Sequence, residues 1–162
     1  MAHKLEVVIK VDVFDSPEEL PEAEKNVLTA AQQATQNAYA PYSGFLVGTA
    51  LLLEDGSVHT GNNQENAAYP SGLCAERTAL FGFRTNNPTT KIRMLAVTAR
   101  PAHSTVYQAA WPCGSCRQVI TEYETRQGSP IKIIMQADNG QVYCCNSASD
   151  LLPLQFSGQN LG

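Results

Sequence analysis

Three cysteines and one glutamate form two short motifs that could hold a metal ion and do chemistry with it. The motifs are Cys74-Ala75-Glu76 and Pro112-Cys113-Gly114-Ser115-Cys116. Two cysteines separated by two residues at a helix start can direct both sulfurs at one ion about 2.3 Å away, and Cys74 can add a third thiolate. Zinc with three protein ligands keeps a fourth position open for water, which is the catalytic pattern. The motifs therefore predict one catalytic zinc ion per chain.

Three thiolates around zinc leave an excess negative charge, which should make the metal's water less acidic than three neutral ligands would. Positive charge nearby must offset this. Helix N-termini carry about half a positive charge each, and both motifs are expected at helix starts. Arg77 lies three residues after Cys74, on the same helical face, and its guanidinium can donate hydrogen bonds to sulfur. Arg117, next to Cys116, is a weaker candidate. Donors of this kind tune a bound metal.

Glu76 follows Cys74 by two residues and is not needed as a ligand. A carboxylate beside metal-bound water can accept its proton and pass that proton to a substrate nitrogen. Three ligands, a glutamate that binds no metal and a downstream Pro-Cys-x-x-Cys are the features of zinc-dependent deaminases. The motifs therefore predict hydrolytic removal of an amine.

Hydrophobic periodicity predicts the elements that must position these motifs. Helices are expected over 22–38, 75–84 and 114–126, with a short helical start at 16–19. Strands are expected over 4–14, 45–53, 58–61, 92–98, 131–136 and 142–145. The polar stretch 62–72 is a long loop, which invites a functional explanation. Alternating helices and strands favour a three-layer α/β/α sandwich around a mixed sheet.

The bulk composition fits one globular domain. The chain has 162 residues, of which 43% are hydrophobic and 16% charged. A net charge of −4 argues against a nucleic-acid partner. We find no membrane span and no secretory signal, so a cytoplasmic protein with reduced thiols is expected. Among its five cysteines, Cys144 and Cys145 are interpreted as ordinary thiols outside the metal site.

Five segments together resemble the short-chain, homotetrameric cytidine deaminases whose zinc ligands are three cysteines. The resemblance covers roughly residues 24–162. The matching segments are 42–48 (YSGFLVG), 61–67 (GNNQENA), 74–79 (CAERTA), 112–118 (PCGSCRQ) and 150–156 (DLLPLQF).

The resemblance implies a role for each residue that matches the family's motifs. Asn63 and Glu65 would hold the ribose hydroxyls, and Phe45 would pack against the pyrimidine ring. The backbone N–H of Ala75 would meet the pyrimidine O2. Glu76 would carry protons to ring N3 and to the leaving ammonia. The implied reaction is hydrolysis of cytidine and 2′-deoxycytidine to uridine and 2′-deoxyuridine, as in pyrimidine salvage.

The same resemblance implies an assembly and a domain plan. Phe156 would reach into a neighbouring subunit's site, so that a homotetramer shares its sites between subunits. The implied fold is a five-stranded sheet covered by helices. Residues 22–162 would form the single catalytic domain. Residues 1–21 would be an N-terminal extension that can add an edge strand.

Other interpretations of the same residues stay open at this point. Cys113 and Cys116 alone would fit a redox dithiol or a structural zinc knuckle. Asn63 and Glu65 could stabilise a polar turn, and Phe45 and Phe156 could be core residues. Alternative functions are deamination of a related small molecule such as a nucleoside antibiotic, deamination of RNA or DNA, and zinc binding without catalysis.

Overall fold

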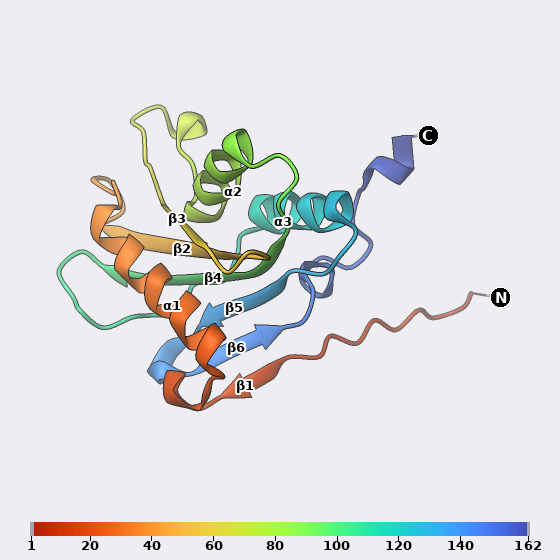
Figure 1. The fold of residues 1–162 in the computed structure, drawn as a ribbon, viewed down its shortest axis with the longest axis horizontal. Helices are drawn as coiled ribbons and strands as arrows, with labels where there is room; N and C mark the ends of the chain where they lie inside the picture. Colours follow the sequence, from red (N-terminus) through yellow and green to blue (C-terminus); the bar gives the residue numbers. More distant parts are fainter. Residues whose placement is uncertain (1, 162) are drawn as a thin grey trace.

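One mixed sheet of six strands organises the computed structural model, which describes residues 2–161 (Figure 1). The strand order is β1-β6-β5-β4-β2-β3, and only β4 and β5 run parallel. The strands are β1 (Asp12–Phe14), β2 (Phe45–Leu53), β3 (Val58–Asn62), β4 (Ile92–Pro101), β5 (Lys132–Gln136) and β6 (Val142–Cys145). The helices are α1 (Glu22–Ala34), α2 (Ala75–Asn86) and α3 (Gly114–Gln127). The expected N-terminal extension begins at Met1, and the expected catalytic domain ends at Gly162. Both of these residues lie outside the described residues.

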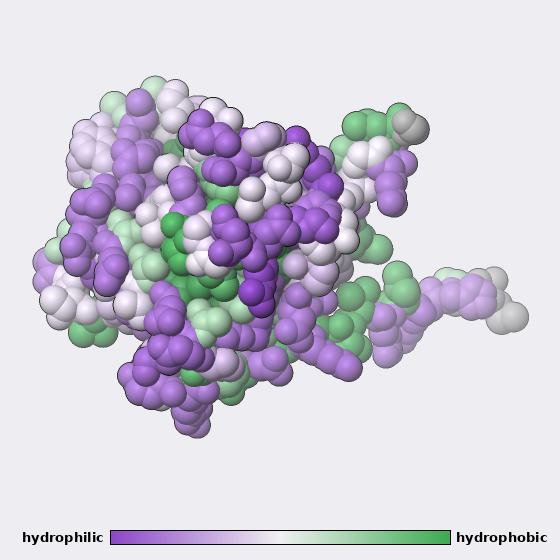
Figure 2. All heavy atoms as spheres, viewed as in Figure 1, coloured by the Kyte–Doolittle hydropathy of each residue, from purple (hydrophilic) through white to green (hydrophobic). Residues whose placement is uncertain are grey.

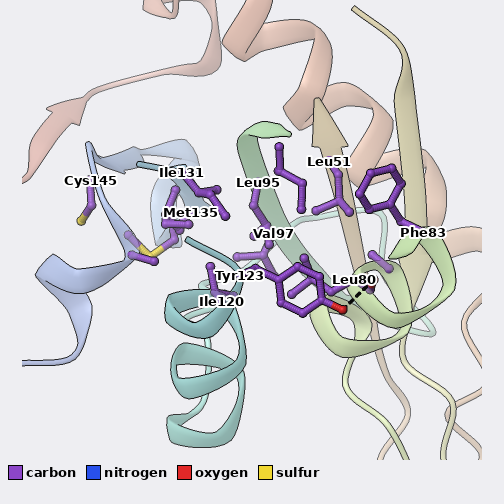
Figure 3. Packing of buried hydrophobic residues seen from close by; sticks show 14 of the residues in the cluster. Leu51, Leu80, Phe83, Leu95, Val97, Ile120, Tyr123, Ile131, Met135 and Cys145 are labelled. Carbon is purple, nitrogen blue, oxygen red and sulfur yellow. Dashed lines mark hydrogen bonds between the residues drawn. The ribbon is translucent and has the colours of Figure 1, made fainter. Parts of the chain in front are cut away.

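The expected three-layer sandwich is confirmed, because helices cover both faces of the sheet (Figure 1). Helix α1 packs on one face, where Val27, Leu28 and Ala31 meet buried residues of β2, β4 and β5. Helices α2 and α3 pack on the other face around Leu80 and Ile120 (Figure 3). This second core places the starts of α2 and α3 beside each other. None of the helices among residues 2–161 is long and apolar enough to cross a membrane.

The N-terminal strand is much shorter than the sequence predicts. Alternation predicts a strand over 4–14, but only Asp12–Phe14 pair, in antiparallel register with β6. The prediction is wrong for residues 4–11, because alternation shows which face of a strand is apolar but cannot supply a partner. Asp12 at the start of β1 is opposite Cys144, and β6 ends one residue later at Cys145, so the residues before β1 have no strand to pair with. β1 is nevertheless the sixth strand, added to the five expected from the resemblance.

Several helix bounds also differ from the prediction. The helix expected over 22–38 ends at Ala34, and the chain tightens into a 3-10 turn, Thr35–Asn37. The expected start at 16–19 is a single 3-10 turn, Pro17–Glu19. Further 3-10 turns lie at Tyr69–Ser71, Asp138–Gly140, Ala148–Leu151 and Gly158–Leu161.

Two glycines let the helices approach the sheet closely. A β-carbon at Gly61 of β3 would lie 2.5 Å from the backbone nitrogen of Ala79 in α2. A β-carbon at Gly48 of β2 would lie 2.0 Å from the carbonyl oxygen of Ala31 in α1. Such distances leave no room for a side chain. The height of α2 above the sheet, and with it the position of the residues at its start, therefore depends on Gly61.

Candidate active site

Cys74, Cys113 and Cys116 form one cluster between the starts of α2 and α3. Their sulfur atoms all lie within 4.8 Å of one another, and Sγ of Cys74 is 4.0 Å from Sγ of Cys113. Zinc–sulfur distances of about 2.3 Å place the sulfurs of a tetrahedral site about 3.8 Å apart. The donor set and its spacing therefore fit zinc. Cys116 is buried, Cys74 half-buried and Cys113 exposed, so the cluster opens to solvent on one side.

Local helix geometry explains how each cysteine reaches the cluster. Cys74 is the N-cap of α2 and Cys113 is the N-cap of α3, while Cys116 lies in the first turn of α3. The first backbone N–H groups of a helix have no partner inside it and carry the positive end of its dipole. Two such ends meet at the three sulfurs, which favours their thiolate forms.

Arg77 adds a full positive charge to the cluster. Its Nη2 donates a hydrogen bond to Sγ of Cys74 at 3.7 Å. Arg117 is turned elsewhere, because its guanidinium donates to the carbonyl oxygens of Pro112 and Leu151 at 2.8 and 3.1 Å. It holds the segment before α3 in place and does not contact sulfur through these bonds.

The electrostatics of the cluster favour a thiolate at Cys74. A hydrogen bond from the Cys116 thiol, with others from Arg77 and Cys113, lowers the pKa of Cys74 to about 5 against the opposing effect of burial. The pKa of Cys116 is raised, because its thiol is hydrogen-bonded to Cys74 and is buried beside Glu76. One sulfur is therefore prepared to bind a cation at neutral pH.

Glu76 lies in the first turn of α2 with only 4% of its surface exposed. Burial raises the pKa of its carboxyl, and the negative charge of Cys74 adds to this effect. A raised pKa makes a carboxylate a better proton acceptor, which suits a group that exchanges protons with a substrate. Its side chain lines the same cavity as Cys74 and Cys113.

The cavity has a volume of about 810 Å³ and is formed by the loop after β3, the starts of α2 and β2, and the segment before α3. Four of the predicted substrate contacts line it, namely Phe45, Asn63, Glu65 and Ala75. The cavity thus brings together residues from three segments that are far apart in the sequence. A volume of this size is typical of small-molecule sites.

Asn63 is buried, and both polar atoms of its side chain bond to the chain's own backbone. Its Oδ1 accepts from the N–H of Val47 at 2.8 Å, and its Nδ2 donates to the carbonyl of Phe45 at 2.9 Å. These bonds tie the loop after β3 to the start of β2. Asn63 therefore stabilises the local chain, as its alternative interpretation as a structural residue expects.

Glu65 holds the turn before β2. Its Oε2 accepts from the N–H groups of Tyr42 and Ser43 at 2.9 and 3.2 Å, and its Oε1 accepts from the Ser43 hydroxyl at 2.5 Å. The Ser43 hydroxyl bond comes first among the contacts that lower the pKa of Glu65, so this carboxyl stays ionised. A carboxylate offers about four acceptor positions, so Oε1 keeps one for a ligand.

Phe156 does not line the cavity among the described residues. It lies in the C-terminal tail, 58% exposed, where its carbonyl accepts a hydrogen bond from Nε2 of Gln118 in α3. The interpretation of Phe156 as a core residue is wrong, because more than half of the residue faces solvent. Cys144 and Cys145 are buried in β6, away from the cysteine cluster.

Sequence reasoning assigned no role to Tyr42, Ser43 and Tyr69, which also line the cavity. The rings of Tyr42 and Tyr69 meet edge to face at 5.9 Å. Tyr42 and Ser43 lie in segment 42–48, one of the five segments that resemble the family, and this position could have indicated that they belong to the site. Trp111 also lines the cavity, and its ring lies 5.1 Å from that of Tyr143.

Residues 21–128 match the sequence profile of a family described as "Cytidine and deoxycytidylate deaminase zinc-binding region". The chain belongs to this cytidine deaminase family. The match includes both cysteine motifs, Glu76 and the loop after β3. The chain is therefore an enzyme of the hydrolase class to which cytidine deaminases belong.

Known members of the family are similar over most of the chain. A cytidine deaminase of Halalkalibacterium halodurans is 38% identical over 137 residues, which are 83% of this chain and 95% of that protein. A cytidine deaminase of Mycobacterium tuberculosis is 41% identical over 64% of this chain and 74% of its own length. The crystal structure of cytidine deaminase from Burkholderia pseudomallei matches with a TM-score of 0.69 at 38% identity, over 81% of this chain and 97% of that one. The resemblance inferred from the motifs is confirmed.

Proposed function

We propose that this protein hydrolyses cytidine and 2′-deoxycytidine to uridine and 2′-deoxyuridine with release of ammonia, a reaction of pyrimidine salvage. One observation carries the proposal: a buried glutamate with a raised pKa lines the same cavity as Cys74 and Cys113, two members of the three-cysteine cluster. The names of the similar enzymes point to the same substrate.

Cys74, Cys113 and Cys116 would hold one zinc ion per chain, and the spacing of their sulfurs supports this assignment. A bound zinc ion acts as a Lewis acid and lowers the pKa of its water toward neutrality. The hydrogen bond from Arg77 and the two helix N-termini would offset the negative charge of the sulfurs.

Glu76 would move protons at the reacting centre. Its carboxylate takes one proton from the attacking water and delivers it to ring N3. It then takes the second proton, from the hydroxyl now bound to C4, and delivers it to the leaving amine nitrogen. Burial supports this role, because the raised pKa makes the carboxylate a stronger proton acceptor.

The remaining contacts would orient the nucleoside in the cavity. The unused acceptor position of Glu65 suits a ribose hydroxyl, with Asn63 beside it. Phe45 offers an aromatic face to the flat pyrimidine. The N–H of Ala75, one of the first in α2, has no acceptor within its own helix and is free to meet the pyrimidine O2.

The assembly, the domain plan and the location complete the proposal. Residues 22–162 would form the catalytic domain and pack as a homotetramer. In it, the exposed Phe156 reaches a neighbour's site. A cytoplasmic location would keep the five free cysteines reduced.

The proposal is tested by metal analysis together with absorbance and ammonia assays on cytidine and 2′-deoxycytidine. We expect one zinc per chain and loss of the cytosine absorbance with equal release of ammonia. Zinc-loaded protein that turns over neither nucleoside would contradict the proposal. Turnover of single-stranded RNA or DNA in preference to free nucleosides would favour the nucleic-acid alternative instead.

A further inference from the structure

Residues 2–11 form an extended arm that pairs with no other strand in residues 2–161. The arm leads into β1 and runs away from the body of the protein (Figure 1). β1 pairs with β6 along one edge, and its other edge is free because β1 ends the strand order. Unpaired backbone N–H and C=O groups along an edge are a template for another strand.

The side chains of the arm separate into one apolar and one charged face. Successive side chains of an extended chain point to opposite faces. The odd positions are Leu5, Val7, Ile9, Val11 and Val13, all between 37% and 76% exposed. The even positions are Lys4, Glu6, Val8, Lys10 and Asp12. The arm thus carries a row of exposed apolar residues beside charged ones, which is visible where it projects in Figure 2. Such a row marks an interaction surface.

The order of the charges is complementary to itself about Val8. When two arms lie antiparallel with Val8 opposite Val8, Glu6 of each copy faces Lys10 of the other. In the same register Lys4 faces Asp12, and the apolar positions face one another as Leu5 with Val11 and Val7 with Ile9. Pairs of opposite charge and apolar pairs are the ones that stabilise neighbouring strands.

Other registers lose this match. If Val7 faced Val7 of the other copy, Lys4 would face Lys10. If Ile9 faced Ile9 of the other copy, Glu6 would face Asp12. A slip that pairs odd with even positions sets apolar side chains against charged ones. The arm therefore favours one register with a second copy of itself.

We propose that residues 4–12 of two copies of this chain pair as an antiparallel ribbon about a two-fold axis at Val8. The free edge of β1 takes part, so the ribbon extends the sheets of both copies. Its apolar face lies on the side of α2 and α3, because Val13 is opposite Tyr143, which packs against the core on that side. Each copy offers the same surface, as a two-fold interface requires. The cysteine site is not involved, so the proposal stands apart from the proposed function.

Cysteine cross-linking of the full chain tests the register. Under mild oxidation, Val8→Cys is expected to form disulfide-linked dimers at least about tenfold faster than Val7→Cys, because only position 8 faces its own copy closely enough for a disulfide. The unsubstituted chain measures the background from the exposed Cys113. Equal rates for the two variants, or no cross-linking above background, would overturn the proposal.

A charge exchange tests the pairing itself in the Val8→Cys background. Glu6→Lys sets lysines against Lys10 on both sides of the axis and should slow cross-linking about tenfold at low salt. Adding Lys10→Glu restores the opposite charges and should restore the rate. If Glu6→Lys slowed cross-linking by damaging the fold, adding Lys10→Glu would not restore the rate. A restored rate therefore supports the pairing. Unchanged cross-linking in Glu6→Lys, or slow cross-linking in both variants, would overturn it.

Discussion

Nη2 of Arg77 lies 3.7 Å from Sγ of Cys74, one helical turn away in α2. The Nε of the same guanidinium is buried and has no hydrogen-bond partner within the described chain. Arg77 is therefore held beside the sulfurs by its helix rather than by a network of other bonds. Through this contact Arg77 brings a full positive charge to the cysteine cluster, of which Cys74 and Cys113 line the cavity.

Arg77→Gln should weaken metal binding about 10- to 100-fold, because it removes a positive donor to the Cys74 thiolate. Competition with a chelator of known affinity measures the change. Arg93→Gln, at an exposed position in β4, is the matched control and should bind like the unsubstituted chain. Equal affinity of Arg77→Gln and the control would show that the guanidinium does not stabilise the metal-bound thiolates.

Glu76→Gln should keep the metal and lose about 10²- to 10⁴-fold or more in turnover, because a carboxamide of similar size cannot accept a proton. Metal content and kcat on cytidine are measured in the same preparation. Glu122→Gln, at an exposed position in α3, changes the same charge away from the cavity and should retain activity. Near-normal turnover in metal-loaded Glu76→Gln would exclude the proposed proton transfer.

Asn63→Ala should lower the free energy of unfolding by about 1–3 kcal/mol, because it leaves the N–H of Val47 and the carbonyl of Phe45 without partners. Denaturant unfolding measures the change. Asn66→Ala is the control, since Asn66 is exposed and its side chain accepts one local bond from Ala68. If both variants unfold alike, the bonds of Asn63 do not stabilise the start of β2.

Gly61→Ala should destabilise the protein by about 1–3 kcal/mol and displace the start of α2, because the new methyl group would collide with the backbone of Ala79. Gly82→Ala tests the same substitution within α2, where the nearest atom is 3.7 Å away, and should be neutral or stabilising. The free energy of unfolding and the metal affinity are measured for both variants. Normal metal affinity in Gly61→Ala would show that the height of α2 does not position Cys74.

Alkaline pH should destabilise the protein partly through Cys144. Burial raises the pKa of this thiol from 9.0 to about 11. A raised pKa in the folded state means that stability is fully present below pH 9 and is lost as the pH rises through 11. Stability measured by denaturant between pH 8 and pH 11 should fall less steeply in Cys144→Ala. If both proteins lost stability equally as the pH rose, the Cys144 thiol would have the same pKa in the folded and unfolded states.

Local chemistry was predictable from the sequence because it depends on neighbours in the chain. A cysteine at a helix start, a glutamate two residues later and an arginine on the same face follow from helical periodicity around Cys74. The sequence predicts the strands β2 and β6 with their observed bounds, because both are mostly apolar and lie next to turns. The family follows from the same motifs.

The tertiary structure alone decided which distant residues meet. Cys74 and Cys113 are 39 residues apart, and their sulfurs approach only because α2 and α3 pack on the same face of the sheet. Glu65 meets Ser43 because the loop after β3 folds back over the turn before β2. Residues 4–11 have the alternation of a strand, yet they stay unpaired where β6 ends. Alternation is a property of one segment, whereas pairing needs a partner that only the folded chain, or a second copy, can provide.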